Sequence, residues 1–340
     1  MPQSILHLAM ASKSRTQAGL INALWKTGVG AGQEMVTMLP VRTTKTLSPI
    51  FNKINNEGAL SSINFRPVGG AFNEGTVSIY QESTDIANVG GDIVIDEAFK
   101  FDDYVEGAKP EVLNVKQKMS LIKRYMNDQS INGDTGTNPY GFTGLRNVVT
   151  TNQTLNTTDI NSGYNNGMTV STSTTTQGDF LTLLDWLIEM VEGDTSKKAL
   201  LMNNNAKRQL RKAARDKSLY NQQKDQYERT IDSYYGVPIL NPGSKNAVEE
   251  YVLANNSTNA VLPNSRSYGS SNAACEIFCI RMDEDDGVTW LQPGGGGLNV
   301  RTVTEEAENA PYKLIRMSWY LSLAVLSKNA LAMLKGVVAA

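Results

Sequence analysis

The chain has 340 residues, of which 40% are hydrophobic and 19% charged, with a formal net charge of -2 and a pI near 5.7. This length and apolar content predict a substantial core and two or more subdomains. The charge balance argues against a dedicated nucleic-acid binder, and no run reaches the roughly 18 apolar residues of a membrane span. The N-terminal residues lack the pattern of a signal peptide, so we expect folding in a cytoplasm.

The N-terminal part of the chain predicts an arm followed by a hairpin. Residues 1–55 contain one short helical candidate, 16–25, and otherwise show no regular pattern. Residues 62–67 and 75–81 are strand-like, and the glycine-containing stretch between them fits a hairpin with a wide tip.

A long amphipathic helix is predicted for residues 110–131. Its apolar residues are spaced three and four apart, which places them on one helical face: Val112, Val115, Met119, Ile122 and Met126. Pro110 suits the first turn, where its missing N–H costs nothing. We interpret the stripe as core-facing, since about two heptads are too few for an independent coiled coil. The helix exits through Asn132-Gly133-Asp134, and Pro139 and Gly144-Leu145 follow.

Residues 150–178 are rich in Thr, Ser, Asn and Gly, so we expect a long surface excursion. Asp179 is the predicted N-cap of a second amphipathic helix, which Gly193 ends. A strand is expected at 198–202.

A third helix, predicted for residues 205–217, carries a basic stripe. We predict that its cations contact another subunit: Lys207, Arg208, Arg211 and Arg215. Contact with nucleic-acid phosphates and a merely solvated face remain open as alternatives.

The acidic run Asp283-Glu284-Asp285-Asp286 leaves carboxylate-dependent catalysis conceivable. The following glycine makes Asp286-Gly287 a two-residue turn signal, so we predict a hairpin between 277–282 and 288–291. An EF-hand is disfavoured because Met282 stands where its first aspartate belongs.

Metal binding and histidine chemistry find little support. The single histidine, His7, lies in the predicted arm, and Cys275 and Cys279 form a C-x₃-C pair without further ligands. In a strand both thiols point to the face of Ile277, so we interpret them as small buried hydrophobes. We predict no metal site, no cofactor and no catalytic residue.

The C-terminal region predicts strands. The glycine run at 294–297 leads into strand-like residues 299–304, which favours a bent loop over a phosphate site. Apolar residues alternate with polar ones over 315–325, so one face of this strand is buried. Its partners must lie far upstream, which indicates an α+β fold whose C-terminus closes a core begun by the helix at 110–131.

The order of these parts resembles the major capsid proteins of tailed bacteriophages, which have the Hong Kong ninety-seven fold. The parts are an arm, an extended hairpin, a spine helix, a Gly-Asp exit with Pro139 and Gly144-Leu145, a second helix, a mixed domain with Tyr235-Gly236-Val237-Pro238-Ile239, and a closing strand. The resemblance runs from about residue 56 to the end and lies in order and spacing.

The resemblance implies a structural protein whose hexamers and pentamers form an icosahedral shell around double-stranded DNA. Implied partners are other copies of the chain, a scaffolding protein, a portal protein, optionally a decoration protein, and packaged DNA through weak non-specific contact, with no membrane. The implied location is the virion, after assembly in the host cytoplasm. Carried onto this chain, the family's parts are an arm at 1–55, an extended loop at 56–95, a peripheral domain at 96–199 with its spine helix, an axial domain at 200–300 and a return strand at 301–340.

Within the extended loop, large or charged side chains stand in an otherwise small and polar protrusion. We predict subunit contacts for Arg66, Phe72 and Glu74. Some relatives cross-link subunits through a lysine of this loop, but no lysine lies between Lys53 and Lys100. We therefore expect no such cross-link. The N-terminal residues also lack the long, charged helices of a fused scaffolding segment, so we expect scaffolding from a separate chain or from a segment removed beforehand.

Three alternatives stay open. One is a phage tail or cell-surface structural protein, which would form tubes or sheets instead of closed shells. An encapsulin-like compartment shell shares the architecture but encloses protein cargo, and a carboxylate-dependent enzyme would use a cleft at Asp283 to Asp286.

Overall fold

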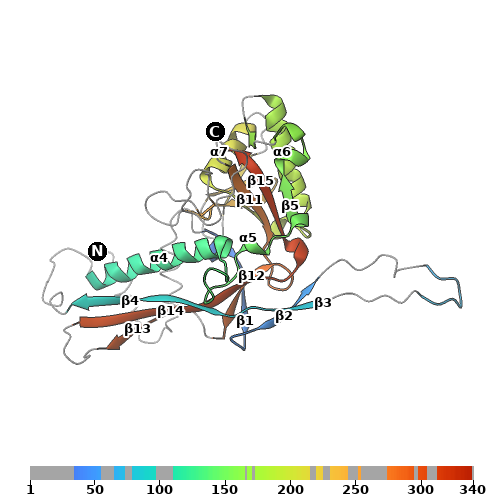
Figure 1. Ribbon diagram of the computed structural model, residues 1–340. Coiled ribbons are helices and arrows are strands. Elements are labelled where there is room, and N and C mark those ends of the chain that lie inside the picture. Colours follow the sequence, from blue (N-terminus) through green and yellow to red (C-terminus); the bar gives the residue numbers. More distant parts are fainter. Residues whose placement is uncertain are drawn as a thin grey trace.

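The computed structural model describes residues 34–54, 65–72, 79–96, 110–164, 167–170, 173–214, 220–224, 230–243, 252–253, 274–294, 298–304 and 312–338. Two β-sheets form the body, each with helices packed against it, and a slender hairpin leaves the body at one side (Figure 1). Both sheets are assembled from strands that lie far apart in the sequence. The fold is thus α+β, as the sequence predicts.

The first sheet contains the long strands of the protein. Its order is β1 (Val41–Thr44), β12 (Val288–Pro293), β14 (Tyr312–Val325) and β13 (Asn299–Thr304), and β4 (Ala87–Asp96) also pairs with β14. The β4–β14 ladder is antiparallel and runs from Ala87 opposite Leu321 to Asp96 opposite Tyr312. Gly90 is required in this ladder because a Cβ there would lie 2.0 Å from the carbonyl oxygen of Met317.

The long helix α4 (Pro110–Asn132) lies along this sheet (Figure 1). Val115, Met119, Ile122 and Met126 are buried in one core with residues of β4 and β14. The predicted helix is therefore confirmed, and its three-and-four spacing has the predicted cause, which is burial of one face against the sheet. The short helix α5 (Leu145–Val148) follows the exit turn.

The second sheet has eight strands. Along its path the order is β5 (Thr154–Asn156), β15 (Leu331–Val338), β11 (Ala274–Arg281), β7 (Lys198–Leu201), β10 (Val237–Leu240), β9 (Thr230–Tyr234) and β8 (Tyr220–Lys224), and β6 (Met168–Thr169) pairs with β15. The helices α6 (Thr174–Glu189) and α7 (Asn204–Ala214) pack with this sheet. Short 3-10 helices lie at Thr151–Gln153, Thr157–Asp159, Ser162–Tyr164, Thr195–Lys197 and Lys328–Ala330.

Strand β11 separates two hydrophobic cores. Phe278 and Ile280 belong to the core shared with α4, whereas Cys275, Ile277 and Cys279 belong to the core under α6 and α7. Both cysteines are free and buried on the face of Ile277, as predicted. The alternation of a strand thus ties the two halves of the body together.

One predicted hairpin, one helix boundary and one predicted surface excursion require correction. The hairpin predicted between 277–282 and 288–291 is wrong, because β11 and β12 belong to different sheets and the turn between them carries the chain from one sheet to the other. The second helix begins at Thr174 rather than after Asp179. The predicted surface excursion at 150–178 contributes β5 and β6, whose Leu155 and Met168 are buried.

Of the predicted arm, residues 34–44 join the body, whereas residues 50–54 form β2, which pairs with β3 (Ile79–Ser83). Helix α3 (Glu34–Met38) places Met35, Val36 and Leu39 in the core with α4, and the Val36 N–H donates to Asn127 Oδ1 at 3.3 Å. Strand β1 follows and pairs in parallel with β12. The helical candidate at 16–25 lies outside the described residues.

Candidate functional site

The hairpin that leaves the body is built from β2 (Ile50–Ile54) and β3 (Ile79–Ser83), which pair antiparallel. Its base is fixed to the body because Phe51 packs against the buried cluster of Leu291, Ala324 and Leu326. Lys53 Nζ lies 3.1 Å from Glu82 Oε2 across the two strands. A hairpin lies in this region, but the predicted pairing of 62–67 with 75–81 is wrong. The first strand is β2, residues 65–67 are not in a strand, and β3 overlaps the second predicted strand at residues 79–81.

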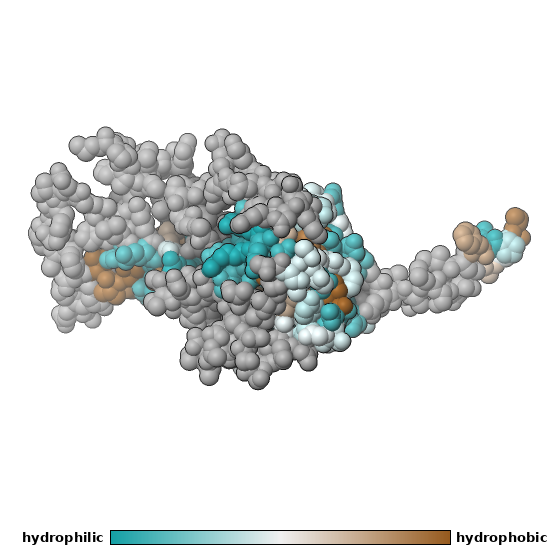
Figure 2. Space-filling model, turned by 90° about the horizontal axis from the view of Figure 1, so that it is seen from above, coloured by the Kyte–Doolittle hydropathy of each residue, from teal (hydrophilic) through white to brown (hydrophobic). Residues whose placement is uncertain are grey.

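Beyond this stem, residues 65–72 form what we call the hairpin tip. Phe65 and Val68 are fully exposed, and Phe72 is 64% exposed. In Figure 2 the described residues at the far end of the projection are partly apolar and stand well away from the body. Exposed apolar side chains in such a position are covered only by another molecule.

The hairpin tip has an internal structure. Arg66 Nη1 donates to the Gly70 carbonyl oxygen at 2.9 Å, and its guanidinium lies 4.7 Å from the centroid of the Phe72 ring. Gly70 N–H donates to the Pro67 carbonyl oxygen at 3.0 Å, and Gly69 has a φ of 84°, which favours glycine. Two of the predicted contact residues, Arg66 and Phe72, therefore touch each other.

Sequence reasoning missed Phe65 and Val68 at this tip. Isolated apolar residues in a polar stretch do not form a helical or strand-like pattern. Their isolation could nevertheless have marked them as exposed contact residues. Glu74 lies outside the described residues.

The basic helix α7 is largely tied to its own chain. Lys207 Nζ donates to the Ile239 carbonyl oxygen at 3.2 Å, and Arg211 Nη2 lies 2.9 Å from Asp232 Oδ2. Lys212, which no contact prediction included, donates to the Val170 carbonyl oxygen at 3.1 Å. Arg208 is exposed, and Arg215 lies outside the described residues. A subunit contact through this helix stays a prediction.

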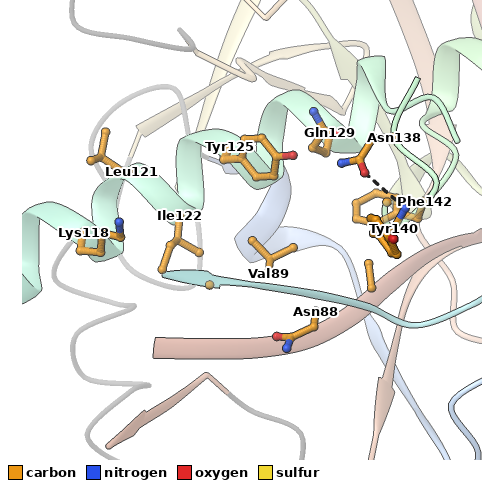
Figure 3. Close-up of a pocket in the computed structure, with 13 residues that line it drawn as sticks. Asn88, Val89, Lys118, Leu121, Ile122, Tyr125, Gln129, Asn138, Tyr140 and Phe142 are labelled. Carbon is orange, nitrogen blue, oxygen red and sulfur yellow. Dashed lines mark hydrogen bonds between the residues drawn. The ribbon is translucent and has the colours of Figure 1, made fainter. Parts of the chain in front are cut away.

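A groove of about 360 Å³ lies between α4, the start of β4 and the loop at 138–142. Figure 3 shows Tyr125 and Ile122 of α4 facing Val89 of β4 across the hollow, with Tyr140 at the loop end. Leu121, Tyr125 and Tyr140 are exposed. The lining is mainly aliphatic and aromatic with Lys118 as its charged residue, which suits contact with another surface rather than acid–base chemistry.

The acidic turn after β11 is a structural junction. Asp283 pairs with Lys197, and this partner holds the pKa of the Asp283 carboxyl below its ordinary value. Arg281 Nη2 lies 2.8 Å from Asp286 Oδ2, and Arg281 Nη1 donates to the Glu192 carbonyl oxygen at 3.0 Å. These ion pairs fix the crossing between the two sheets, so Asp283 and Asp286 of the acidic run have structural partners.

The buried thiols are similarly unsuited to nucleophilic chemistry, because burial raises the pKa of Cys275 to about 11 and that of Cys279 to about 12. Among the described residues, His, Cys, Asp and Glu side chains form no cluster that could hold a metal ion. In the same part of the chain no helix has the length and apolar character needed to cross a membrane.

Comparison with known proteins identifies the fold. No family model and no curated protein matches the sequence. Among solved structures, the holo-SrpI encapsulin complex from Synechococcus elongatus PCC 7942 is 16% identical with a TM-score of 0.61, over 91% of this chain and 89% of that chain. The capsid of the native GTA particle is 14% identical with a TM-score of 0.59, over 91% of each chain. A chain of Microbacterium phage Oxtober96 is 10% identical with a TM-score of 0.53, over 91% of each chain.

These likenesses span about nine tenths of the chain and include both sheets. The protein has the Hong Kong ninety-seven fold, which it shares with that encapsulin and that capsid. The predicted fold class is confirmed.

Proposed function

We propose that the chain is a shell subunit, a major capsid protein that assembles into hexamers and pentamers of an icosahedral shell enclosing double-stranded DNA. The role is structural and non-catalytic. Copies of the chain itself are the main partner, and the resemblance to phage capsid proteins adds a scaffolding protein, a portal protein, an optional decoration protein and weak contact with packaged DNA. The location is the virion.

The observation that carries this proposal is the hairpin tip. Phe65 and Val68 are fully exposed at the end of a projection that stands away from the body, on a fold shared with an encapsulin and a capsid. A side chain in this position gains burial only when another molecule covers it. When each copy makes the same contact with the next copy, related by a fixed rotation, the copies close into a ring. A shell is assembled from such rings.

The charge balance of the chain fits this role. The net charge is -2, and Lys207, Arg211 and Lys212 of α7 already contact groups of their own chain. A shell that must release its DNA needs weak contact with phosphates, because each neutralised phosphate strengthens binding.

An encapsulin-like compartment is the second candidate. The match to the Synechococcus encapsulin complex favours it, since that structure covers 91% of this chain with a TM-score of 0.61. The two candidates differ in content, because a capsid holds nucleic acid and a compartment holds protein.

The test is electron microscopy of the purified protein together with analysis of the particle contents after nuclease treatment. The capsid proposal expects closed polyhedral particles, or rings of five and six, and nuclease-protected double-stranded DNA in particles from the native source. Closed particles that hold a stoichiometric protein and no DNA would favour the compartment. Tubes, sheets or a stable monomer would overturn both candidates.

A further inference from the structure

The turn between β9 and β10 holds a tyrosine in a backbone conformation that tyrosine rarely adopts. Tyr235 has a φ of 48° and Gly236 a φ of 82°. The flanking residues Tyr234 and Val237 pair directly, so the loop has two residues, both with positive φ as in a type I′ hairpin. Asparagine, aspartate and glycine suit the first position of this turn, whereas a bulky side chain is strained there.

The strained side chain gains little from its own chain. Tyr235 is 56% exposed, and its ring meets the buried Tyr234 edge-on with centroids 4.7 Å apart. An exposed hairpin end without a functional constraint would tolerate asparagine, which relieves the strain. Strained residues that persist at exposed positions often serve a binding function.

The base under Tyr235 is rigid. Tyr234 is fully buried, and its hydroxyl donates to Asp185 Oδ1 of α6 at 2.9 Å. Asp232 of the same hairpin is bonded to Arg211 of α7. The turn is therefore held from both helices of the second sheet, so the exposed ring is already in place before any partner arrives, which lowers the entropic cost of contact.

We infer that Tyr235 is an aromatic anchor in a contact between two copies of this chain, separate from the contact made by the hairpin tip. This inference rests on the proposed shell function, which supplies a neighbouring copy at every position. The two turn residues, Tyr235 and Gly236, carry no charge, and tyrosine is enriched in the desolvated centres of interfaces. The second sheet and the hairpin tip lie in different parts of the molecule, so the two contacts use different surfaces (Figure 1).

The experiment compares wild type with Tyr235→Asn and Tyr235→Phe. It measures the denaturant midpoint of the unassembled subunit and the lowest protein concentration at which shells form. Tyr235→Asn removes both the strain and the ring, so we expect a higher midpoint together with a rise of about tenfold or more in the assembly concentration. Tyr235→Phe keeps both, so both values should stay within about twofold of wild type.

The proposed anchor predicts that Tyr235→Asn makes the subunit more stable and at the same time makes assembly weaker. Tyr140→Asn is a control for the stability gain, because Tyr140 is also exposed but does not have positive φ. If Tyr235→Asn forms shells at the wild-type concentration, the inference is wrong while the shell function stands. If wild type forms no assembly of any kind, the shell function and this inference both fail.

Discussion

Strand β11 in the body and the tip of the hairpin differ in the burial of their apolar side chains. In the body, β11 buries both of its faces, with Phe278 in one core and Ile277 in the other. In the hairpin, Phe65 and Val68 remain fully exposed although the tip around them is held by an Arg66 hydrogen bond and a ring contact. Strand β11 buries its apolar side chains within its own chain, whereas we propose that another copy of the chain covers those of the tip.

The strongest test of this contrast removes the tip's apolar side chains. Replacing Phe65, Val68 and Phe72 together with serine should abolish shell formation, because the surface that a neighbour covers is lost. The unassembled subunit should keep its denaturant midpoint, since Phe65 and Val68 are fully exposed and Phe72 is largely exposed. Electron microscopy and urea unfolding measure the two effects. A triple variant that still forms closed shells would remove the tip from the interface.

A smaller tip variant follows from the sequence-based contact prediction. Arg66→Ala, Phe72→Ala and Glu74→Ala combined should impair assembly while the subunit stays folded. If assembly is unchanged, these three residues make no essential subunit contact.

In the body, the corresponding change should act on stability. Phe278 is fully buried between strands of the second sheet, so Phe278→Ala should lower the free energy of unfolding by about 3–5 kcal/mol. Phe72→Ala is the matched control from the tip and should change it by less than about 0.5 kcal/mol. Equal losses in the two variants would contradict the contrast between body and tip.

The buried ion pair between α5 and β11 tests how the two halves of the body are joined. Arg146 Nη2 lies 2.7 Å from Glu276 Oε2, and Asn132 at the end of α4 also contacts Arg146. Arg146→Met leaves a carboxylate without its partner, so unfolding should become about 3 kcal/mol easier. Arg316→Met, which breaks an exposed pair with Asp92, should destabilise the fold far less, because solvent screens exposed ion pairs. Thermal unfolding of both variants measures this difference.

The junction turn predicts a smaller effect that depends on pH. Lys197 lowers the pKa of Asp283 in the folded state, so the pair stabilises the fold above the ordinary aspartate pKa of about 3.9 and this stabilisation is lost as the pH falls through the lowered value. Asp283→Asn should therefore be less stable than wild type at pH 7, and the gap should close on acidification. Glu284→Gln, in the same turn, is the control. If the stability difference between wild type and Asp283→Asn grew as the pH fell, the pKa of Asp283 would not be lowered in the folded state.

No lysine lies between Lys53 and Lys100, so we predict that the extended loop forms no covalent cross-link between subunits. Boiled, denatured shells should run as a single subunit band on a gel. A ladder of covalent multimers would overturn this prediction.

Elements with a strong local pattern were predictable from the sequence. The α4 stripe reflects burial of one face, and so does the alternation in β14 up to Tyr320, whereas residues 321–325 are buried on both faces. The sequence also implied that β14 pairs far upstream; it does so with β4, but it also pairs with the nearby strands β12 and β13. The junction was not predictable, because Asp286-Gly287 has the same local chemistry whether the flanking strands pair or separate. The separation is set by distant partners, β7 and β15 for β11, and β1 and β14 for β12.

The candidate site was less predictable than the fold. Arg66 and Phe72 stood out by size and charge, but their contact depends on the turn at Gly69. The basic residues of α7 formed a visible stripe, yet the partners of Lys207 and Arg211 come from β10 and β9, which no local pattern specifies. The strain at Tyr235 is a backbone property and became visible only in the structure.

The most direct measurement is a cryo-electron microscopy map of the assembled protein at side-chain resolution. The account predicts a closed shell in which residues 65–72 of each copy lie against a neighbouring copy, with Phe65 and Val68 buried. A closed shell in which the tip faces solvent in every copy would contradict the claim that this hairpin is ordered for a neighbour.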